Sequence, residues 1–236
     1  NGVPVGYVQS DTLWNCVDLA FNTFATFRGV EAAVVLGRTM AMLRYVFDAT
    51  SFTLEPYQLG DGNDEGLASG AWWFYYRLGF RPRSRRVRVL ARAELERMQQ
   101  KPGHRSSAAT LAELAKDYLY FEWSGIRAPR WPRLAALGSE AARRHFQQGG
   151  GGGVAHPLAK VADAMLRRAT PDELRAWANW APIVSFIPGV GQWSDDEKLD
   201  LVKVILAKGG ARDTDYLRLF DRHPKLGGAL REQSKA

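Results

Sequence analysis

The sequence predicts an α/β domain with a mixed sheet, followed by an all-helical C-terminal region. Residues 3–27 are rich in Val, Phe, Thr and Tyr with partial apolar alternation, which is typical of strands. Residues 31–47 place apolar side chains at helical spacing, and a short strand pattern follows at 51–57. Beyond residue 157, helix-start signals recur.

The first half alternates strands and helices. We expect strands at about 3–10 and 15–26, a helix at 31–47 and a strand at 51–57 that Pro56 stops. A second helix is expected from about Glu65 to Leu78, with Gly79 as its left-handed C-terminal cap. A strand, a helix and a parallel strand imply a right-handed crossover. Ligands in such sheets usually lie at the C-terminal ends of the strands.

The remaining chain divides by composition. Helices are expected at about 87–100 and, from the capping-box pair Thr110 and Glu113, at 110–120. Pro129, Pro132 and five glycines at 149–153 have linker composition. Helices near 157–168, after Thr170 and after Ser194 complete the chain. The predicted organisation is a core with trailing helices (1–123), a Pro/Gly-rich linker (124–156) and a helical annex (157–236).

Composition excludes several functional classes. One cysteine and four scattered histidines in 236 residues argue against a disulfide framework and a zinc site. We therefore expect a reducing, cytoplasmic location and no metal. No run of 18 apolar residues occurs, so no membrane span is expected. Because the chain opens at Asn1 within a strand-like pattern, we expect a fragment that lacks its true N-terminus.

The segment "FYYRLGF" resembles a motif of the GCN5-related N-acetyltransferase superfamily. Phe74, Tyr75, Leu78, Gly79 and Phe80 match the end of that family's penultimate helix. The resemblance covers about residues 1–82. It implies an acyl-CoA N-acyltransferase-like fold, acetyl-CoA or another acyl-CoA as co-substrate, and an unknown amine as acceptor.

A second match is "FRGVEAA", at the turn from the second strand into the first helix. The family binds the coenzyme A pyrophosphate there, and the resemblance assigns Arg28, Gly29, Ala32 and Ala33 to this role. Backbone N–H groups at a helix N-terminus form an anion cradle. Glu31 departs from the pattern, because its carboxylate opposes a pyrophosphate.

The resemblance also implies catalytic roles. Tyr75 would protonate the departing thiolate as general acid. Glu55 is the predicted base that deprotonates the acceptor amine, and Asp18 is an alternative. Tyr75 could instead simply pack its helix on the sheet, and a carboxylate on a strand could be solvated.

Arginines are concentrated between residues 77 and 88 within a chain of net charge +7. They could contact an acidic protein partner, a phosphorylated coenzyme or nucleic acid, or form an ordinary solvated face. No nucleic-acid-binding motif accompanies these arginines, so nucleic-acid binding is the weakest of these hypotheses. The leading prediction is a CoA-dependent N-acyltransferase, and the alternative is a catalytically inactive module of the same type that binds proteins through its basic face.

Overall fold

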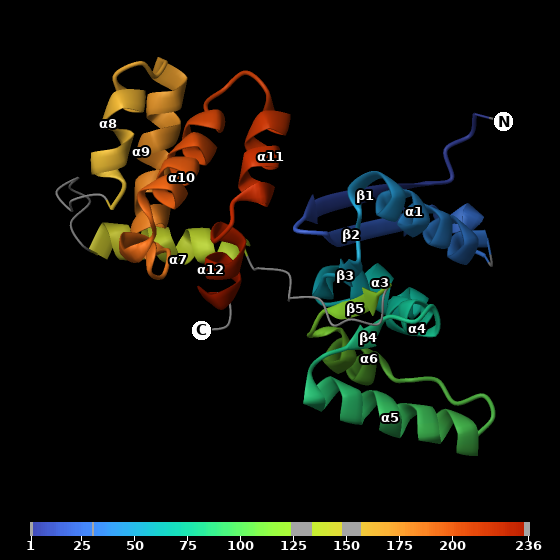
Figure 1. Cartoon of the computed structure of the whole chain (residues 1–236). Helices are drawn as coiled ribbons and strands as arrows, with labels where there is room; N and C mark the ends of the chain where they lie inside the picture. The colour runs from blue at the N-terminus through green and yellow to red at the C-terminus, as the bar shows by residue number, and fades with distance from the viewer. Residues whose placement is uncertain (1, 30, 124–133, 148–156, 234–236) are drawn as a thin grey trace. The chain divides into compact units, whose positions relative to one another are not determined.

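The computed structural model describes residues 2–29, 31–123, 134–147 and 157–233 (Figure 1). The chain divides into two compact units, Asn1–Ala128 and Pro129–Ala236. Unit 1 contains a five-stranded mixed sheet with helices. The prediction of a mixed α/β protein is therefore confirmed.

The sheet of unit 1 runs in the order β1-β2-β3-β5-β4. Its strands are β1 (Gly6–Leu13), β2 (Cys16–Thr23), β3 (Ser51–Leu54), β4 (Arg81–Pro82) and β5 (Leu119–Glu122). β2 and β3 are parallel, whereas the other neighbouring strands are antiparallel. β1 and β4 therefore lie at opposite edges (Figure 1).

β1 and β2 form a hairpin with a left-handed turn. Trp14 and Asn15 are its two turn residues, with φ of 50° and 61°. This turn type matches the right-handed twist of paired strands. The Asn15 side chain donates a 3.0 Å hydrogen bond to the carbonyl of Asp48, just before β3. The turn lies later than expected, so the strands predicted at 3–10 and 15–26 differ from β1 and β2 at their ends.

The 3₁₀ turn η1 (Ala25–Phe27) and the helix α1 (Glu31–Phe47) lie between the two parallel strands. α1 has the predicted bounds. Its buried side includes Leu36, Met40 and Leu43, which belong to the same apolar core as the sheet residues Val17 and Phe52. The apolar spacing of the sequence thus fixes which side of α1 faces the sheet.

The region after β3 is more broken than predicted. β3 ends at Leu54, and Pro56 begins the short helix α2 (Pro56–Leu59). The helix expected at 65–78 is divided at Gly70 into α3 (Asp64–Ser69) and α4 (Ala71–Arg77). Gly70 has a φ of 66°, which favours glycine and ends α3. Gly79, with φ 101°, follows α4 as predicted.

The prediction of a helix at 110–120 is wrong in its bounds, because the helix lies earlier and a strand follows it. α6 (Ala108–Ala115) begins earlier, because the Ser107 hydroxyl caps it by accepting from the Thr110 backbone N–H. The chain then becomes β5, which pairs with β3 on one side and β4 on the other. Apolar and aromatic residues at 119–121 favour this strand once two partners are available. Such non-local pairing overrides the local helix signal.

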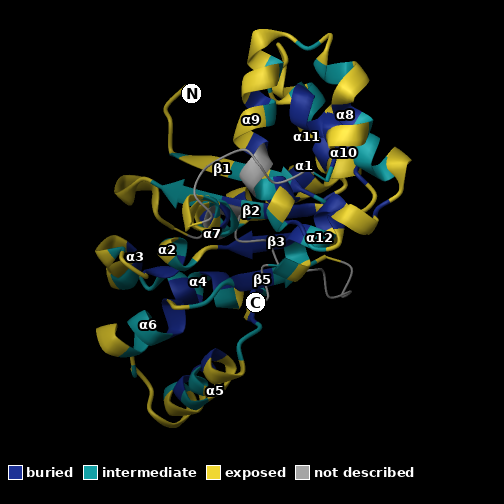
Figure 2. Cartoon of the chain, turned by 90° about the vertical axis from the view of Figure 1, so that its left-hand side faces the viewer, coloured by how far each residue is buried: buried dark blue, intermediate teal, exposed yellow. Residues whose placement is uncertain are grey.

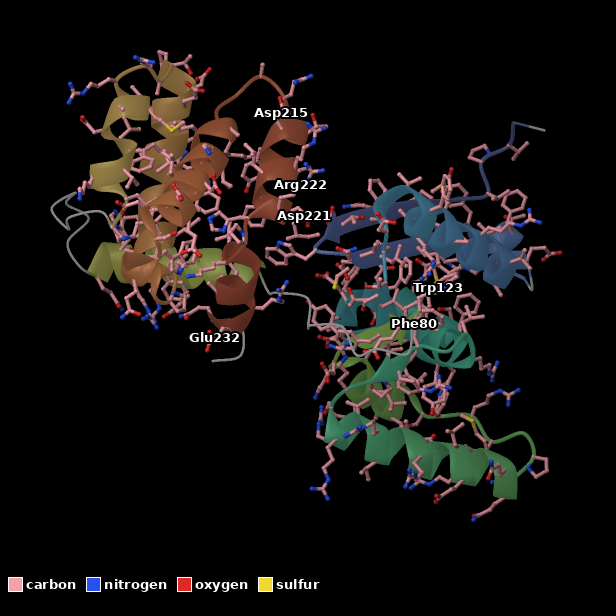
Figure 3. The ribbon with its side chains drawn as sticks, in the orientation of Figure 1. Phe80, Trp123, Asp215, Asp221, Arg222 and Glu232 are labelled. Carbon is pink, nitrogen blue, oxygen red and sulfur yellow. The ribbon has the colours of Figure 1, made fainter. Side chains whose placement is uncertain are left out.

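Aromatic side chains fill the centre of unit 1. Phe121 lies between Phe80 and Trp123, with ring centroids 5.6 and 5.9 Å away, and Figure 3 labels the two outer rings. Trp72 of α4 is fully buried in the same core. Figure 2 shows β3 and β5 buried between more exposed helices. These contacts fix α4 against the sheet.

α5 (Arg85–Gln100) is held by a buried carboxylate. The Glu94 side chain is 1% exposed and accepts hydrogen bonds from Ser106 at 2.6 Å and Arg97 at 2.5 Å. Ser106 also accepts from the indole N–H of Trp73 on α4 at 3.0 Å. These partners satisfy the hydrogen-bonding capacity of the buried carboxylate. The resulting network connects α4, α5 and the loop before α6.

The described residues of unit 2 form helices. They are α7 (Leu134–Gln147), α8 (Ala159–Leu166), α9 (Pro171–Phe186), α10 (Asp195–Ala207), α11 (Asp213–Arg222) and α12 (Leu226–Gln233), with the 3₁₀ turn η2 (Val190–Gln192). Asp215, Asp221 and Arg222 lie along α11, and Glu232 lies on α12 (Figure 3). The helices predicted after Thr170 and after Ser194 are confirmed, and both begin with a capping box.

The linker predicted at 124–156 requires one correction. Residues 134–147 form the helix α7. The prolines before it and the glycines after it gave the whole segment the composition of a linker, so its helical pattern was missed. Residues 124–133 and 148–156 lie outside the described part of the chain. The unit boundary falls after Ala128, within the predicted linker.

Tryptophans pack the helices of unit 2. Trp180 of α9 contacts Phe220 of α11, with ring centroids 6.2 Å apart. Trp193 contacts His223 at 5.1 Å. Both tryptophans are buried, which argues against a stacking platform for bases at these positions.

Candidate functional site

Unit 1 contains a cavity of about 380 Å³ at the end of β2. Its lining comes from segments that are distant in sequence. The lining residues are Tyr7, Phe21, Asn22, Thr23, Arg28, Gly29, Ala32, Tyr57, Gln58, Asn63, Glu65, Gly66, Ser69, Ala71, Phe74 and Tyr75. The volume suits part of a small molecule or an extended chain.

The sheet itself creates the space for this cavity. β2 and β3 pair through three residues each, from Cys16 to Asp18 and from Ser51 to Thr53. β2 then continues to Thr23, whereas β3 ends at Leu54. The last residues of β2 therefore extend past their parallel neighbour. The cavity lies at the C-terminal end of a parallel strand, where ligands were predicted.

Four of the six predicted site residues line the cavity. Arg28 and Gly29 come from the turn before α1, Ala32 comes from the first turn of α1, and Tyr75 comes from α4. Ala33, the next residue of α1, and Glu55 are not among the lining residues described. The structure thus brings the predicted acid close to the predicted cradle, but leaves the predicted base outside the cavity.

Arg28 is already paired within the chain. Its Nε donates to the carbonyl of Thr23 at 3.1 Å, and its Nη2 forms an ion pair with the carboxylate of Glu65. The two side chains are 39% and 67% exposed. Ion pairs at such exposure contribute little stability, about 0 to 1 kcal/mol. An anionic ligand could therefore compete with Glu65 for the guanidinium at small cost.

Gly29 leaves space that Glu31 partly occupies. A Cβ on Gly29 would lie 2.8 Å from Oε2 of Glu31. The Glu31 carboxylate therefore lies beside Gly29 and within the first turn of α1. The positive end of the helix dipole stabilises a carboxylate there. Glu31 is not among the cavity-lining residues described, but its carboxylate lies beside Gly29, which is one of them.

Tyr75 is buried and hydrogen-bonded to the sheet. The residue is 3% exposed, and its hydroxyl donates to the carbonyl of Phe21 at 3.3 Å. Burial raises the pKa of the phenol above its ordinary value. Tyr75 is therefore protonated at neutral pH and able to donate a hydrogen bond. Its ring also packs edge-to-face on Phe80, so the side chain has a packing role as well.

Asp18 and Glu55 lie near one another and away from the cavity lining. Asp18 accepts a 2.7 Å hydrogen bond from the Thr53 hydroxyl, and it lies opposite Asp11 in the hairpin. Burial raises the pKa of Asp18 to about 7, with smaller contributions from Glu55 and Asp11, while the Thr53 hydrogen bond opposes the shift. Glu55 precedes α2 and accepts from the Tyr118 hydroxyl at 3.4 Å.

Asp18 is separated from Tyr75 by strand geometry. Asp18 and Phe21 are three positions apart on β2, which corresponds to about 10 Å along a strand. Their side chains also alternate to opposite faces of the sheet. Asp18 has the protonation behaviour of a base near neutral pH, but it is not positioned beside the Tyr75 hydroxyl. The assignment of a base to either carboxylate stays a prediction.

The arginine run is largely used within unit 1. Arg81 donates to the carbonyls of Tyr76 and Phe80 and stacks on the Tyr76 ring. Arg83 is paired with Glu122, 2.5 Å away, and its side chain is only 7% exposed. Arg86 forms an ion pair with Glu113. These three arginines therefore hold the end of α4, the sheet edge and α5 in place.

Sequence reasoning missed the part of the cavity formed by α2, α3 and the loop between them. Asn63 caps α3 by accepting from the Gly66 backbone N–H at 3.0 Å and donates to the Tyr57 carbonyl at 3.0 Å. The Gly- and Asn-rich stretch at 58–63 was a signal for a loop, not for a binding wall. Glu65 is 37 residues from Arg28, and no local pattern predicts that pair.

Three further findings bear on the function of the chain. No group of His, Cys, Asp and Glu suited to a metal ion was found among the described residues. No helix in the described part of the chain is long and apolar enough to cross a membrane. Searches against family models, curated proteins and solved structures gave no match for this chain. The assignment of function therefore depends on the cavity.

Proposed function

We propose that unit 1 is an acyl-CoA-dependent N-acyltransferase domain whose cavity binds the co-substrate. The observation that carries this proposal is that Arg28, Gly29, Ala32 and Tyr75 line one cavity. The resemblance assigns these residues from two separate sequence segments. The end of β2, which extends past its parallel neighbour β3, supports the same assignment, because ligands usually bind at such strand ends.

The cavity fits a phosphorylated ligand in part. Gly29, Ala32 and the N-terminus of α1 offer small side chains and a positive helix end. Arg28 supplies a guanidinium, provided that Glu65 releases it. Glu31 opposes the fit through its charge. We therefore expect weaker binding of phosphates than an unobstructed cradle would give.

Tyr75 would act at the reacting end of the ligand. Acyl-CoA would supply a thioester; the acceptor amine forms a bond to its carbonyl carbon while the carbon–sulfur bond breaks. The Tyr75 hydroxyl would turn from the Phe21 carbonyl and donate its proton to the leaving sulfur. The surplus proton of the amine then returns to the phenolate through water, so Tyr75 ends each cycle protonated.

Calorimetric titration with acetyl-CoA tests the proposal. We expect saturable binding by the wild-type chain, and loss of binding in Ser69→Trp, which would fill the cavity from the end of α3. Trp at exposed Val89 of α5 is the matched control, because it adds the same ring outside the cavity. Binding that survives Ser69→Trp would contradict the assignment of the site.

A non-catalytic binding module is the second candidate. Its supporting observation is that two carboxylates, Glu31 and Glu65, are close to Arg28 and Gly29 within the predicted cradle. If neither the wild type nor a Glu31→Gln, Glu65→Gln double variant binds acetyl-CoA while both remain folded, this candidate is favoured. Binding by the double variant alone would indicate a coenzyme site blocked by its own carboxylates.

A further inference from the structure

The outward side of α1 is apolar, in contrast to an ordinary surface helix. Its buried side includes Leu36, Met40 and Leu43. On the opposite side lie five large apolar residues that are 42% to 88% exposed. They are Val34 (55%), Val35 (42%), Met42 (57%), Tyr45 (88%) and Val46 (58%). We call these five residues the outer α1 face.

The five residues form one continuous surface. At 100° per residue, they fall within an arc of about 120° on the helix. Two charged residues, Arg38 and Glu31 at the start of α1, also fall within that arc, and Thr39 borders it. Single exposed apolar residues are normal, but a contiguous apolar stripe usually marks an interaction site.

The neighbouring sheet edge also carries an exposed apolar side chain. Val8 of β1 is 38% exposed and pairs with Phe21, whose side chain packs against the core that α1 covers. Val8 is therefore on the α1 side of the sheet. β1 is an edge strand in the described sheet, so its outer side has no partner strand there.

We propose that the outer α1 face is a homodimer interface, in which α1 packs antiparallel against α1 of a second copy. A twofold axis near Met40 would place Val34 opposite Val46 and Val35 opposite Tyr45 of the other copy. In the middle of the face, the same axis places Met42 opposite Arg38 of the other copy, whose aliphatic stem can pack against it. The face is therefore self-complementary under this symmetry.

The available area agrees with a second copy as the occupant. If the exposed parts of the five residues were buried completely, they would offer at most about 500 Å² per copy. Two copies would bury about 1,000 Å², which is near the lower limit for a specific interface. We therefore expect a concentration-dependent dimer. This inference does not rest on the acyltransferase proposal.

Sedimentation velocity of the full chain tests the dimer. We expect a shift from monomer to dimer as the concentration rises through the micromolar range. Val46→Glu should abolish the shift, because it places a carboxylate against Val34 of the other copy. Val89→Glu is the matched control, since Val89 is 63% exposed on α5. Unchanged circular dichroism for both variants would exclude unfolding as the cause.

Spin labels test the orientation of the two helices. In an antiparallel pair, labels at Arg38 lie close to the axis, while labels at Val34 are farther from it. With a rise of 1.5 Å per residue, the Val34 pair should be longer than the Arg38 pair by at least about 6 Å. A parallel pair would give equal distances. A chain that stays monomeric at high concentration, or a dimer that Val46→Glu leaves intact, overturns the proposal.

Discussion

Replacing Glu31 by glutamine is expected to tighten the binding of phosphorylated ligands to the cavity. The change removes one negative charge beside Gly29 and preserves the size of the side chain. Two unit charges about 4 Å apart in water interact by about 1 kcal/mol. A pyrophosphate with two charges would therefore gain about 1 to 2 kcal/mol, which is a decrease in Kd of about five- to thirty-fold.

The same substitution is expected to cost a little stability. Glu31 is the acidic residue in the first turn of α1, where a carboxylate contributes about 0.3 to 1 kcal/mol through the helix dipole. Unfolding in denaturant would measure this loss. Tighter binding together with lower stability would show that the Glu31 carboxylate stabilises α1 and at the same time weakens the binding of phosphates.

Calorimetric titration with inorganic pyrophosphate and with CoA measures the gain. Glu96→Gln is the matched control, because Glu96 is an exposed residue of α5 and the variant has the same net charge. The difference between the two variants should shrink at high salt, since exposed charges are screened. If Glu31→Gln binds no more tightly than Glu96→Gln at low salt, the electrostatic reasoning is wrong.

Three further predictions concern single side chains. Tyr75→Phe should lower turnover about 100-fold or more with little change in the Kd of acetyl-CoA; an equal loss of coenzyme binding or of folding would return Tyr75 to a packing role. His223 accepts from the backbone N–H groups of Lys225 and Leu226 and donates to the Glu197 carbonyl, and burial lowers its pKa. Because the unfolded chain binds this proton more readily, unit 2 should unfold more easily as the pH falls below about 6.5. Tryptophan fluorescence measures this unfolding, and a stability that does not change with pH would contradict the assignment. Gly209→Ala should destabilise unit 2 by about 1 to 3 kcal/mol, since a Cβ there would lie 2.4 Å from the Asp172 carbonyl oxygen. Gly228→Ala in α12 meets open space and should stabilise unit 2 by about 0.5 to 1 kcal/mol. Thermal melting that ranks the two variants in the opposite order would refute the packing argument.

Local signals in the sequence predicted the elements that depend on local physics. The bounds of α1 follow from apolar residues at helical spacing, and the caps at Thr170 and Ser194 follow from residues three positions apart. β5 was missed because its four residues become a strand only between β3 and β4. The division of the predicted helix at Gly70 shows how a glycine within a helical pattern can end one helix and begin another.

The candidate site divides in the same way. Arg28, Gly29 and Tyr75 were predicted because short motifs contain them. Glu65 could not be predicted, since its pairing with Arg28 depends on how α3 lies against the turn into α1. Glu55 was assigned from its place at a strand end, but its side chain faces Tyr118 and not the cavity lining. Long-range packing determined each of these differences.

The central claim is that acyl-CoA binds in this cavity through the turn into α1. The most direct test is the change in backbone amide chemical shifts of the labelled full chain on addition of acetyl-CoA. We expect the largest changes at Gly29, Ala32 and Gly66, which line the cavity from two different helices and the turn before α1. Saturating changes confined to other parts of the chain, or no changes at all in the folded wild type and in Glu31→Gln, would contradict it.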